Sequence, residues 1–221
     1  MIAREKIYDA AMRLPIVVFT LFLMGRETMG IRELVAGHPY VNGDWPFLGT
    51  IAARVSVIMF LAVLAALHIA RRRPTNKHVA LQPKIVAVLG LTFTLLVLLL
   101  PRASANLQWD MLSTALILAG NTFSVLSVLD LGRSLSIMPE ARKLVTEGLY
   151  RRIRHPLYLA EEIATLGLFL QFRSWQAALI LIVHFYLQIR RMDWEEDILS
   201  RTFPEYIEYM RRTFRLVPGL Y

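Results

Sequence analysis

Six apolar segments, separated by short polar stretches, dominate this chain of 221 residues. A helix needs about 20 mostly apolar residues to cross the hydrocarbon core of a bilayer, and several segments approach that length. Backbone polar groups in lipid must be paired internally, which segments of this length achieve as helices. The sequence therefore predicts an all-α, polytopic membrane helical bundle. The segments cover residues 12–30, 46–70, 84–101, 107–131, 156–172 and 174–190.

The first and the last two segments are the least regular. Arg4, Lys6 and Arg13 precede the first segment as in a signal peptide, but no small-residue cleavage site follows, so we expect a retained helix. Its short apolar core leaves two arrangements open: about six transmembrane helices, or five with the first helix in the interface. Segments five and six are separated only by Arg173 and predict a short helical hairpin.

Positive charges are concentrated on alternate loops. The stretches before segment one and after segments two, four and six hold 20 of the 25 Lys and Arg residues. Cytoplasmic loops are enriched in these residues, so we expect both termini in the cytoplasm, in a bacterial inner membrane or a eukaryotic endoplasmic reticulum. The net charge of +8 fits contact with anionic headgroups, and no basic face with interleaved aromatic residues predicts nucleic-acid binding.

Several kinds of catalytic site lack their essential residues. The chain has no cysteine, which excludes disulfides, thiolate nucleophiles and cysteine-bound metals. It has no glycine-rich nucleotide loop and no nucleophilic-serine elbow, so we expect neither a Rossmann domain nor a serine hydrolase. We expect no metal site, because the histidines are not spaced as metal ligands. The histidines are His38, His68, His78, His155 and His184.

Two charged clusters flank the predicted hairpin. Pro is favoured at the first position of a helix, so segment five is expected to start at His155-Pro156, with free backbone N–H groups pointing into the cytoplasmic interface. The arginines just before it make this helix start either an anion site or a lipid anchor and topology signal. After segment six, Arg191 and Glu195 are spaced for a helical ion pair. With the acidic residues that follow, they also suit a ligand carrying both charge signs.

Further polar residues lie inside the apolar segments. Glu161 and Glu162 either face a polar cavity or lie near the headgroups, since an unpaired buried carboxylate is costly. His184, Gln188 and Asn121 are expected to hydrogen-bond between helices.

The polar tail after residue 190 begins as a continuation of segment six. Pro204 predicts the end of that helix near Phe203. Tyr206, Tyr209 and Phe214 form an aromatic face that either lies against the membrane or closes a site, and we favour the membrane.

Together, the polar motifs resemble those of one superfamily. They are Leu131-Gly-Arg-Ser, the stretch from Leu144 to Tyr158 with its Arg154-His-Pro-Leu-Tyr run, Glu195-Glu196 followed by Leu199, Phe203, Tyr206 and Tyr209, and a late Val217-Pro218. Over about residues 130–218, this combination resembles the isoprenylcysteine carboxyl methyltransferase and phospholipid methyltransferase superfamily. The resemblance divides the chain into transmembrane helices on the lipid and acceptor side, residues 1–130, and a catalytic region, residues 131–221.

The resemblance implies an integral membrane methyltransferase that uses S-adenosyl-L-methionine and has no Rossmann domain. It implies that Arg191 and Glu195 are catalytic: Glu195 binds the positive groups of the cofactor, and Arg191 orients the acceptor. Glu161 and Glu162 are unusual for the family and suggest a polar pocket for the acceptor. The other cofactor contacts that it implies are Arg142, Lys143, Leu144, Val145, Tyr150, His155, Pro156, Leu157 and Tyr158.

The expected acceptor is a membrane lipid or a lipidated small molecule. Methyl transfer from a sulfonium needs proximity, alignment and exclusion of water. Arg191 favours carboxyl O-methylation of an isoprenylcysteine-like or other lipid acid; the alternative is N-methylation of a phosphatidylethanolamine-type lipid. A sterol-reductase-like oxidoreductase and a non-enzymatic lipid-binding protein are the other classes, and the oligomeric state stays open. Ala160 and Pro204 replace glycines frequent in the family, which puts the shape of the acceptor side in question.

Overall fold

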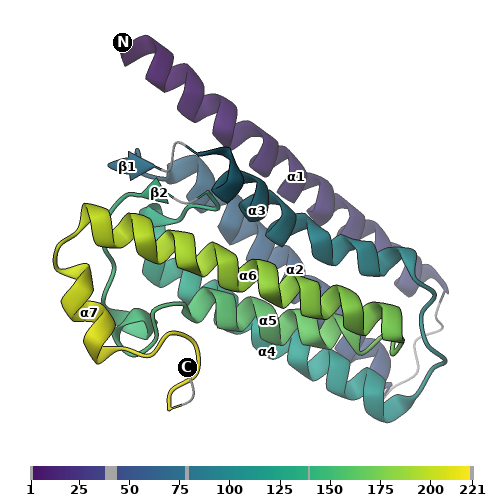
Figure 1. Ribbon diagram of the computed structural model, residues 1–221. Helices are drawn as coiled ribbons and strands as arrows, with labels where there is room; N and C mark the ends of the chain where they lie inside the picture. The colour runs from purple at the N-terminus through teal and green to yellow at the C-terminus, as the bar shows by residue number, and fades with distance from the viewer. Residues whose placement is uncertain (1, 38–43, 78–79, 139, 220–221) are drawn as a thin grey trace.

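The computed structural model describes residues 2–37, 44–77, 80–138 and 140–219, and this part of the chain is mainly helical, with only two short strands (Figure 1). The all-α class is thus confirmed. The α-helices are α1 (Ile2–Gly37), α2 (Trp45–Ala70), α3 (Leu81–Thr92), α4 (Leu107–Leu131), α5 (Pro156–Phe169), α6 (Trp175–Thr202) and α7 (Tyr206–Arg212). Between them lie the 3₁₀ helices η1 (Phe93–Leu99), η2 (Gly132–Ser134) and η3 (Gly148–Arg151), and the short strands β1 (Asn76–Lys77) and β2 (Glu140–Ala141).

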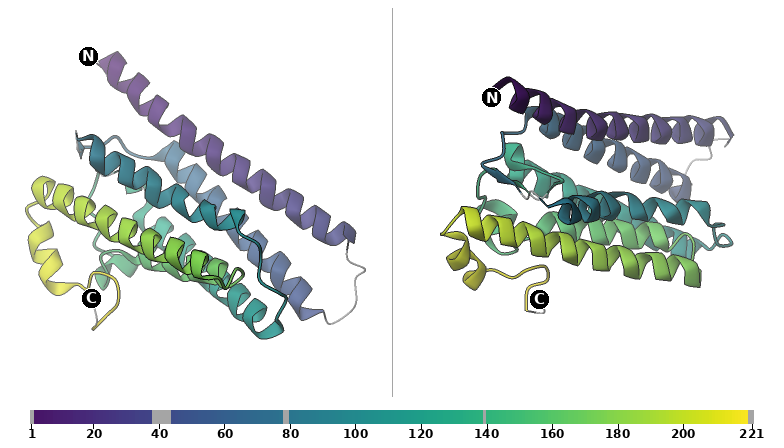
Figure 2. Two further views of the ribbon diagram at one scale, coloured as in Figure 1. Left: turned by 45° about the vertical axis from the view of Figure 1, so that its right-hand side comes forward. Right: turned by 45° about the horizontal axis from the view of Figure 1, so that its top comes forward.

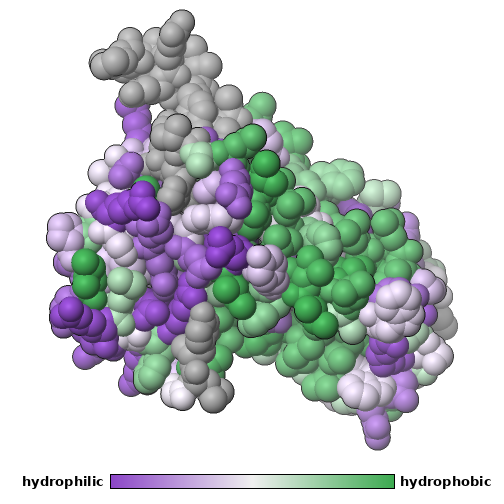
Figure 3. Space-filling view, viewed as in Figure 1, coloured by the Kyte–Doolittle hydropathy of each residue, from purple (hydrophilic) through white to green (hydrophobic). Residues whose placement is uncertain are grey.

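Four helical stretches of the described chain are long and apolar enough to cross a membrane. They are Arg13–Gly37, Trp45–Ala70, Leu81–Leu99 and Leu107–Ser134. They correspond to the first four predicted segments, and the first helix continues beyond the predicted end at residue 30. Apolar side chains cover the middle of the bundle, whereas polar ones gather at the end that carries β1, β2 and α7 (Figure 3). So wide an exposed apolar band fits lipid rather than water.

The predicted hairpin is formed by α5 and the first half of α6, joined at residues 170–174. At about 1.5 Å per residue, the 14 residues of α5 span only about 21 Å. The tip of the hairpin still reaches the loop before α4, where the N–H of Ala103 donates to the carbonyl of Gln171 at 3.0 Å. Arg173 at the tip donates to the carbonyl of Ser104. The hairpin therefore extends to the end of the bundle that lies away from β1, β2 and α7.

Helices α4 and α5 pack closely through small residues. A Cβ at Gly120 would lie 2.4 Å from the backbone nitrogen of Ala164 and 2.8 Å from the carbonyl oxygen of Ala160, so no side chain fits there. Small residues at such crossings let membrane helices approach each other. Ala160 is fully buried. Ala160, which replaces a glycine frequent in the family, therefore packs against α4.

Isolated polar residues join helices, as predicted. Asn121 Nδ2 donates to Ser56 Oγ at 3.1 Å and ties α4 to α2. His184 Nδ1 lies 2.9 Å from Thr94 Oγ1 and ties α6 to η1. These contacts satisfy polar groups that lipid cannot hydrogen-bond.

The loops that carry most of the positive charge meet at one end of the bundle (Figure 2). Strands β1 and β2 pair antiparallel, with Asn76 opposite Ala141 and Lys77 opposite Glu140. Helix α6 ends at Thr202, and α7 turns back beside its last turns. The charged stretches that follow α2 and α4 and the tail that follows α6 therefore lie at the same end of the bundle.

Candidate functional site

A cavity opens at this end, between the loop that follows α4 and the last turns of α6. Including its opening to solvent, it measures about 550 Å³. Its wall contains seven of the residues predicted to contact a cofactor: Arg142, Lys143, Leu144, Val145, Tyr150, His155 and Glu195. The other lining residues had not been assigned to a cofactor: Leu131, Ser134, Ser136, Met138, Glu140, Arg154, Leu199, Tyr206 and Tyr209. We call this the larger cavity.

A smaller cavity of about 220 Å³ adjoins it on the side of α3. Its lining combines apolar side chains with one basic and one acidic residue: Pro83, Ala87, Ile137, Met138, Tyr158, Arg191, Trp194 and Glu195. Met138 and Glu195 line both cavities. The two spaces therefore share a wall.

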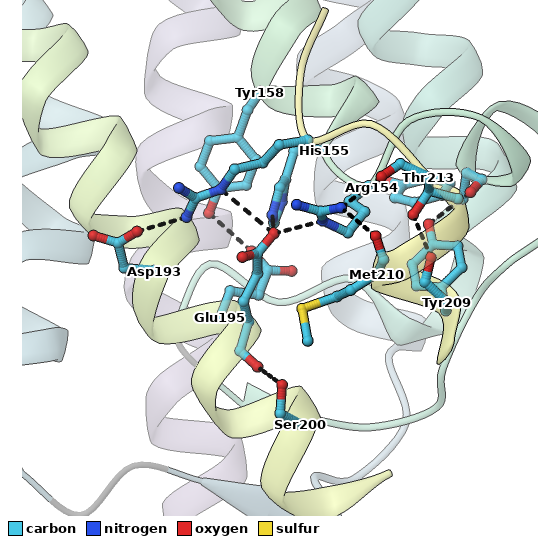
Figure 4. Close-up of polar contacts among 12 residues, drawn as sticks. Arg154, His155, Tyr158, Asp193, Glu195, Ser200, Tyr209, Met210 and Thr213 are labelled. Carbon is cyan, nitrogen blue, oxygen red and sulfur yellow. Dashed lines mark hydrogen bonds and ion pairs between the residues drawn. The ribbon is translucent and has the colours of Figure 1, made fainter. Parts of the chain in front are cut away.

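Glu195 and Arg191 are held by Tyr158 rather than by each other. Tyr158 Oη donates to Glu195 Oε2 at 3.0 Å (Figure 4). The Arg191 guanidinium lies over the Tyr158 ring, 5.0 Å from its centroid, and its Nη1 donates to Gln188 Oε1 at 2.5 Å. The i,i+4 ion pair considered for Arg191 and Glu195 is therefore replaced by contacts through the tyrosine.

Glu196 forms a charged hub beside the larger cavity. Its Oε1 lies 2.8 Å from Arg154 Nε, 3.0 Å from His155 Nε2 and 3.4 Å from Arg215 Nε. Burial acts to raise the pKa of Glu196, but the hydrogen bonds and charges of these three side chains outweigh it and lower the pKa to about 2. The hub joins the start of α5, the end of α6 and the tail. Sequence reasoning grouped Glu196 with the acidic residues that suit a ligand carrying both charge signs, and it did not predict these contacts with Arg154, His155 and Arg215.

The C-terminal tail pairs with the loop before α5. The N–H groups of Arg154 and His155 donate to the carbonyls of Phe214 and Arg215, at 2.8 and 3.1 Å. The side chain of Arg154 also donates to two carbonyls of the tail (Figure 4). At the predicted helix start, the N–H of His155 is therefore not free, because the tail accepts from this donor.

The favoured membrane position is also wrong for the two tail tyrosines. Tyr206 and Tyr209 are 1% and 3% exposed, and both line the larger cavity. Tyr209 Oη donates to the carbonyl of Tyr150 at 2.6 Å, and burial raises the pKa of the Tyr206 and Tyr209 phenols, so they stay protonated. The turn at Pro204 brings α7 back onto the bundle. Phe214 alone of the aromatic face remains about half exposed.

Two predicted contact residues lie behind the cavities. Pro156 occupies the first turn of α5, as predicted, and is buried. Leu157 packs against an apolar cluster that includes Leu64, Val128 and Leu135. Neither residue is part of the lining of the two cavities.

The two carboxylates of α5 are paired with side chains of α6. Glu161 Oε2 accepts from Gln188 Nε2 at 3.1 Å, and Glu162 Oε1 lies 3.0 Å from His184 Nε2. Pairing of this kind offsets part of the cost of burying a carboxylate.

Metal ligands were also considered among the acidic and histidine residues. His38 and His78 lie outside the described residues. In the part of the chain that the structure describes, no three His, Asp or Glu side chains are grouped to hold a metal ion.

Gly148 opens the η3 turn that carries Tyr150, and we expect Gly148→Ala to destabilise it. The residue has φ +60°, and a Cβ would lie 2.2 Å from Asp130 Oδ2, the acceptor for the N–H of Leu149 at 2.8 Å. Backbone strain of about 1–2 kcal/mol and the damaged hydrogen bond together should cost at least about 2 kcal/mol. Thermal unfolding in detergent measures this loss. Gly219→Ala is the control, because φ is +82° there but no atom lies within 4 Å of the added Cβ. An equal loss of stability in both variants would mean that the contact with Asp130 does not contribute.

Comparison with known proteins gives the same assignment to this part of the chain. Residues 109–206 match the family model described as phospholipid methyltransferase, in the isoprenylcysteine carboxyl methyltransferase-like superfamily. The superfamily recognised from the motifs is confirmed for this region. The match supports a membrane methyltransferase and implies a methyl donor.

Two curated relatives match over shorter stretches. The chain is 39% identical over 82 residues to the nickel-cobalt-cadmium resistance protein NccN of Alcaligenes xylosoxydans xylosoxydans, covering 37% of this chain and 38% of the relative. It is 38% identical over 78 residues to the cobalt-zinc-cadmium resistance protein CzcN of Cupriavidus metallidurans, covering 35% of this chain and 36% of the relative. The matched stretches thus cover well under half the length of either relative.

Proposed function

We propose that this protein is an S-adenosyl-L-methionine-dependent membrane methyltransferase, with the cofactor in the larger cavity and a lipophilic acceptor in the smaller one. The observation that carries the proposal is the wall that the cavities share at Met138 and Glu195. Adjoining ligands place a methyl donor beside an acceptor, and proximity is the main requirement of a displacement at an activated carbon.

The residues of the larger cavity fit the parts of this cofactor. Glu195 suits its ammonium and sulfonium, Lys143 suits its carboxylate, and Tyr150 with the leucines of the lining suits its purine. The Arg142 side chain is fully buried against Glu140, so Arg142 would contribute through its backbone. When bound, S-adenosyl-L-methionine supplies a methyl group on a positively charged sulfur. The chain's own residues orient the ligands and exclude water.

The smaller cavity draws on both parts of the chain. Pro83 and Ala87 of α3 face it from the N-terminal helices, whereas Tyr158 belongs to α5 and Arg191 to α6. This supports the division into an acceptor side, residues 1–130, and a catalytic region, residues 131–221. The clustered positive loops support a cytoplasmic position for the site and for both termini.

Charge around Arg191 favours an amine over a carboxylate as the acceptor. The carboxylates of Glu161, Glu195 and Glu162 all act electrostatically on this one guanidinium. A lipid acid would add a fourth negative charge to a poorly solvated space, whereas an ammonium group brings the charges closer to balance. Only the neutral amine can accept a methyl group, so the bound ammonium would first give a proton to Glu195, the carboxylate of the smaller cavity. We therefore place N-methylation of a phosphatidylethanolamine-type lipid ahead of carboxyl O-methylation of an isoprenylcysteine-like acid, the reverse of the order that Arg191 alone suggested.

Purified protein incubated with methyl-labelled cofactor tests this proposal. We expect label in phosphatidylethanolamine, in a product that resists mild base, because N-methyl bonds survive conditions that cleave methyl esters. Label that mild base releases from a prenylcysteine acceptor would reverse the choice of acceptor. Binding of a nicotinamide dinucleotide in place of S-adenosylhomocysteine would support the reductase class, and transfer to neither lipid would contradict the proposal.

A further inference from the structure

A stripe of polar side chains runs along one face of α6 from the smaller cavity into the apolar part of the bundle. His184, Gln188, Arg191 and Glu195 are spaced by four, three and four residues, which places them on one side of a helix. The first three are 3%, 1% and 9% exposed. These three residues of α6 are therefore buried against α5 and α3, and Glu195 at the end of the stripe is partly exposed.

Gln188 is the central link of this stripe, because its amide bridges two opposite charges. Its Oε1 accepts from Arg191 Nη1 at 2.5 Å, and its Nε2 donates to Glu161 Oε2 at 3.1 Å. A guanidinium only donates and a carboxylate only accepts, so the amide fits in this orientation alone. Glu161 is thus coupled to Arg191 without touching it.

Helix α3 holds the bridge in place from the other side. A Cβ at Gly90 would lie 2.6 Å from Arg191 Cδ and 3.2 Å from Gln188 Oε1. The close approach leaves Arg191 little room to turn away from Gln188 and the Tyr158 ring. Tyr158 in turn donates to Glu195, so the contacts run from Glu161 to the wall shared by both cavities.

We propose that Glu161 sets the acceptor specificity of this site by acting through Gln188. In the methyltransferase proposed above, on which this inference rests, Glu161 and Gln188 are positioning residues. Together they hold Arg191 in place and offset its positive charge. The negative charge of Glu195 then remains to attract the acceptor. An ammonium group then binds beside Glu195, whereas a carboxylate competes with the Gln188–Glu161 bridge for Arg191, the one cation in the described lining of the smaller cavity. The specificity for a positively charged acceptor follows from a residue that does not line the cavity.

Glu161→Gln tests the inference, because the introduced amide can still accept from Gln188 and only the charge is lost. We expect the ratio of kcat/KM for phosphatidylethanolamine to kcat/KM for a prenylcysteine acid to fall about tenfold or more, through the acceptor KM, with the affinity for S-adenosylhomocysteine unchanged. Glu161→Gln combined with Gln188→Glu moves the carboxylate next to Arg191 and should restore the ratio. If the single variant does not fold, Gln188→Leu takes its place in the comparison with the double variant.

Glu162→Gln is the matched control. It removes the same charge one residue along α5, but Glu162 faces His184, lines neither cavity and acts on Arg191 less than Glu161 does. We expect its ratio to change less than threefold. An equal shift in the Glu161 and Glu162 variants, or a double variant that stays as low as the single, would overturn the inference. A wild-type protein that prefers the acid would overturn it as well. Failure of the wild-type protein to methylate either lipid contradicts the proposed function itself, so the two failures are distinguishable.

Discussion

Replacing Glu195 by Gln is expected to lower kcat/KM for methyl transfer about a hundredfold while leaving the fold intact. Glu195 is the one acidic residue that lines both cavities. The carbonyl oxygen of the introduced glutamine can still accept from Tyr158 Oη, so the geometry persists and only the negative charge is lost. Interactions of charged groups contribute about 1.5–3 kcal/mol, and about 1.4 kcal/mol corresponds to tenfold. Loss of charge at a wall common to two ligands falls at the upper end of that range.

Initial rates with labelled cofactor, together with the affinity for S-adenosylhomocysteine, measure the effect. The midpoint of thermal unfolding should move by less than about 2 °C, because we expect the free energy of unfolding to change as little as in a surface substitution. Glu208→Gln is the control: it makes the same chemical change in an ion pair with Arg211 whose side chains are 67% and 75% exposed. If the Glu195 variant keeps more than a third of the wild-type rate, the carboxylate is not part of the reaction site.

Features set by local sequence were predictable. Pro156 starts α5 because its ring suits the first helical position, and Pro204 follows the end of α6 because it cannot continue the helix. Arg173 marks the hairpin tip because apolar residues flank it on both sides. Of the sixteen residues that line the larger cavity, six that lie close together in the sequence, between Arg142 and His155, were already named as cofactor contacts through the family resemblance.

Features set by the relative rotation of helices were not predictable. Glu195 and Glu196 differ by about 100° around α6, and only packing decides that one lines the cavities and the other meets Arg154 and His155. The Gln188 bridge depends in the same way on the register between α5 and α6. Tyr206 is buried because of the direction that the chain takes after Pro204, which no periodicity encodes.

Glu196→Gln is expected to lower the stability of the protein rather than to remove a ligand contact. Arg154, His155 and Arg215 all converge on one oxygen of this carboxylate, and its side chain is 16% exposed. Its pKa of about 2, against an ordinary value of 4.5, corresponds to about 3 kcal/mol of stabilisation at neutral pH. Since the hub holds the tail against the start of α5, the variant should unfold several degrees below the wild type and bind S-adenosylhomocysteine less tightly.

The pH dependence of this difference identifies the charge as its source. A carboxylate whose pKa is lower in the folded state stabilises the fold above its unfolded pKa of about 4.5, and this contribution is lost as the pH falls toward about 2. The gap in unfolding midpoint between wild type and Glu196→Gln should therefore be wide at pH 6 and narrow steadily below pH 4.5. Asp197→Asn provides the comparison, because its ion pair with Arg201 is largely exposed and contributes only about 0.3–0.5 kcal/mol. A gap that stays constant from pH 6 to pH 3 would mean that the introduced glutamine disturbs packing, and that the ionised hub does not hold the tail.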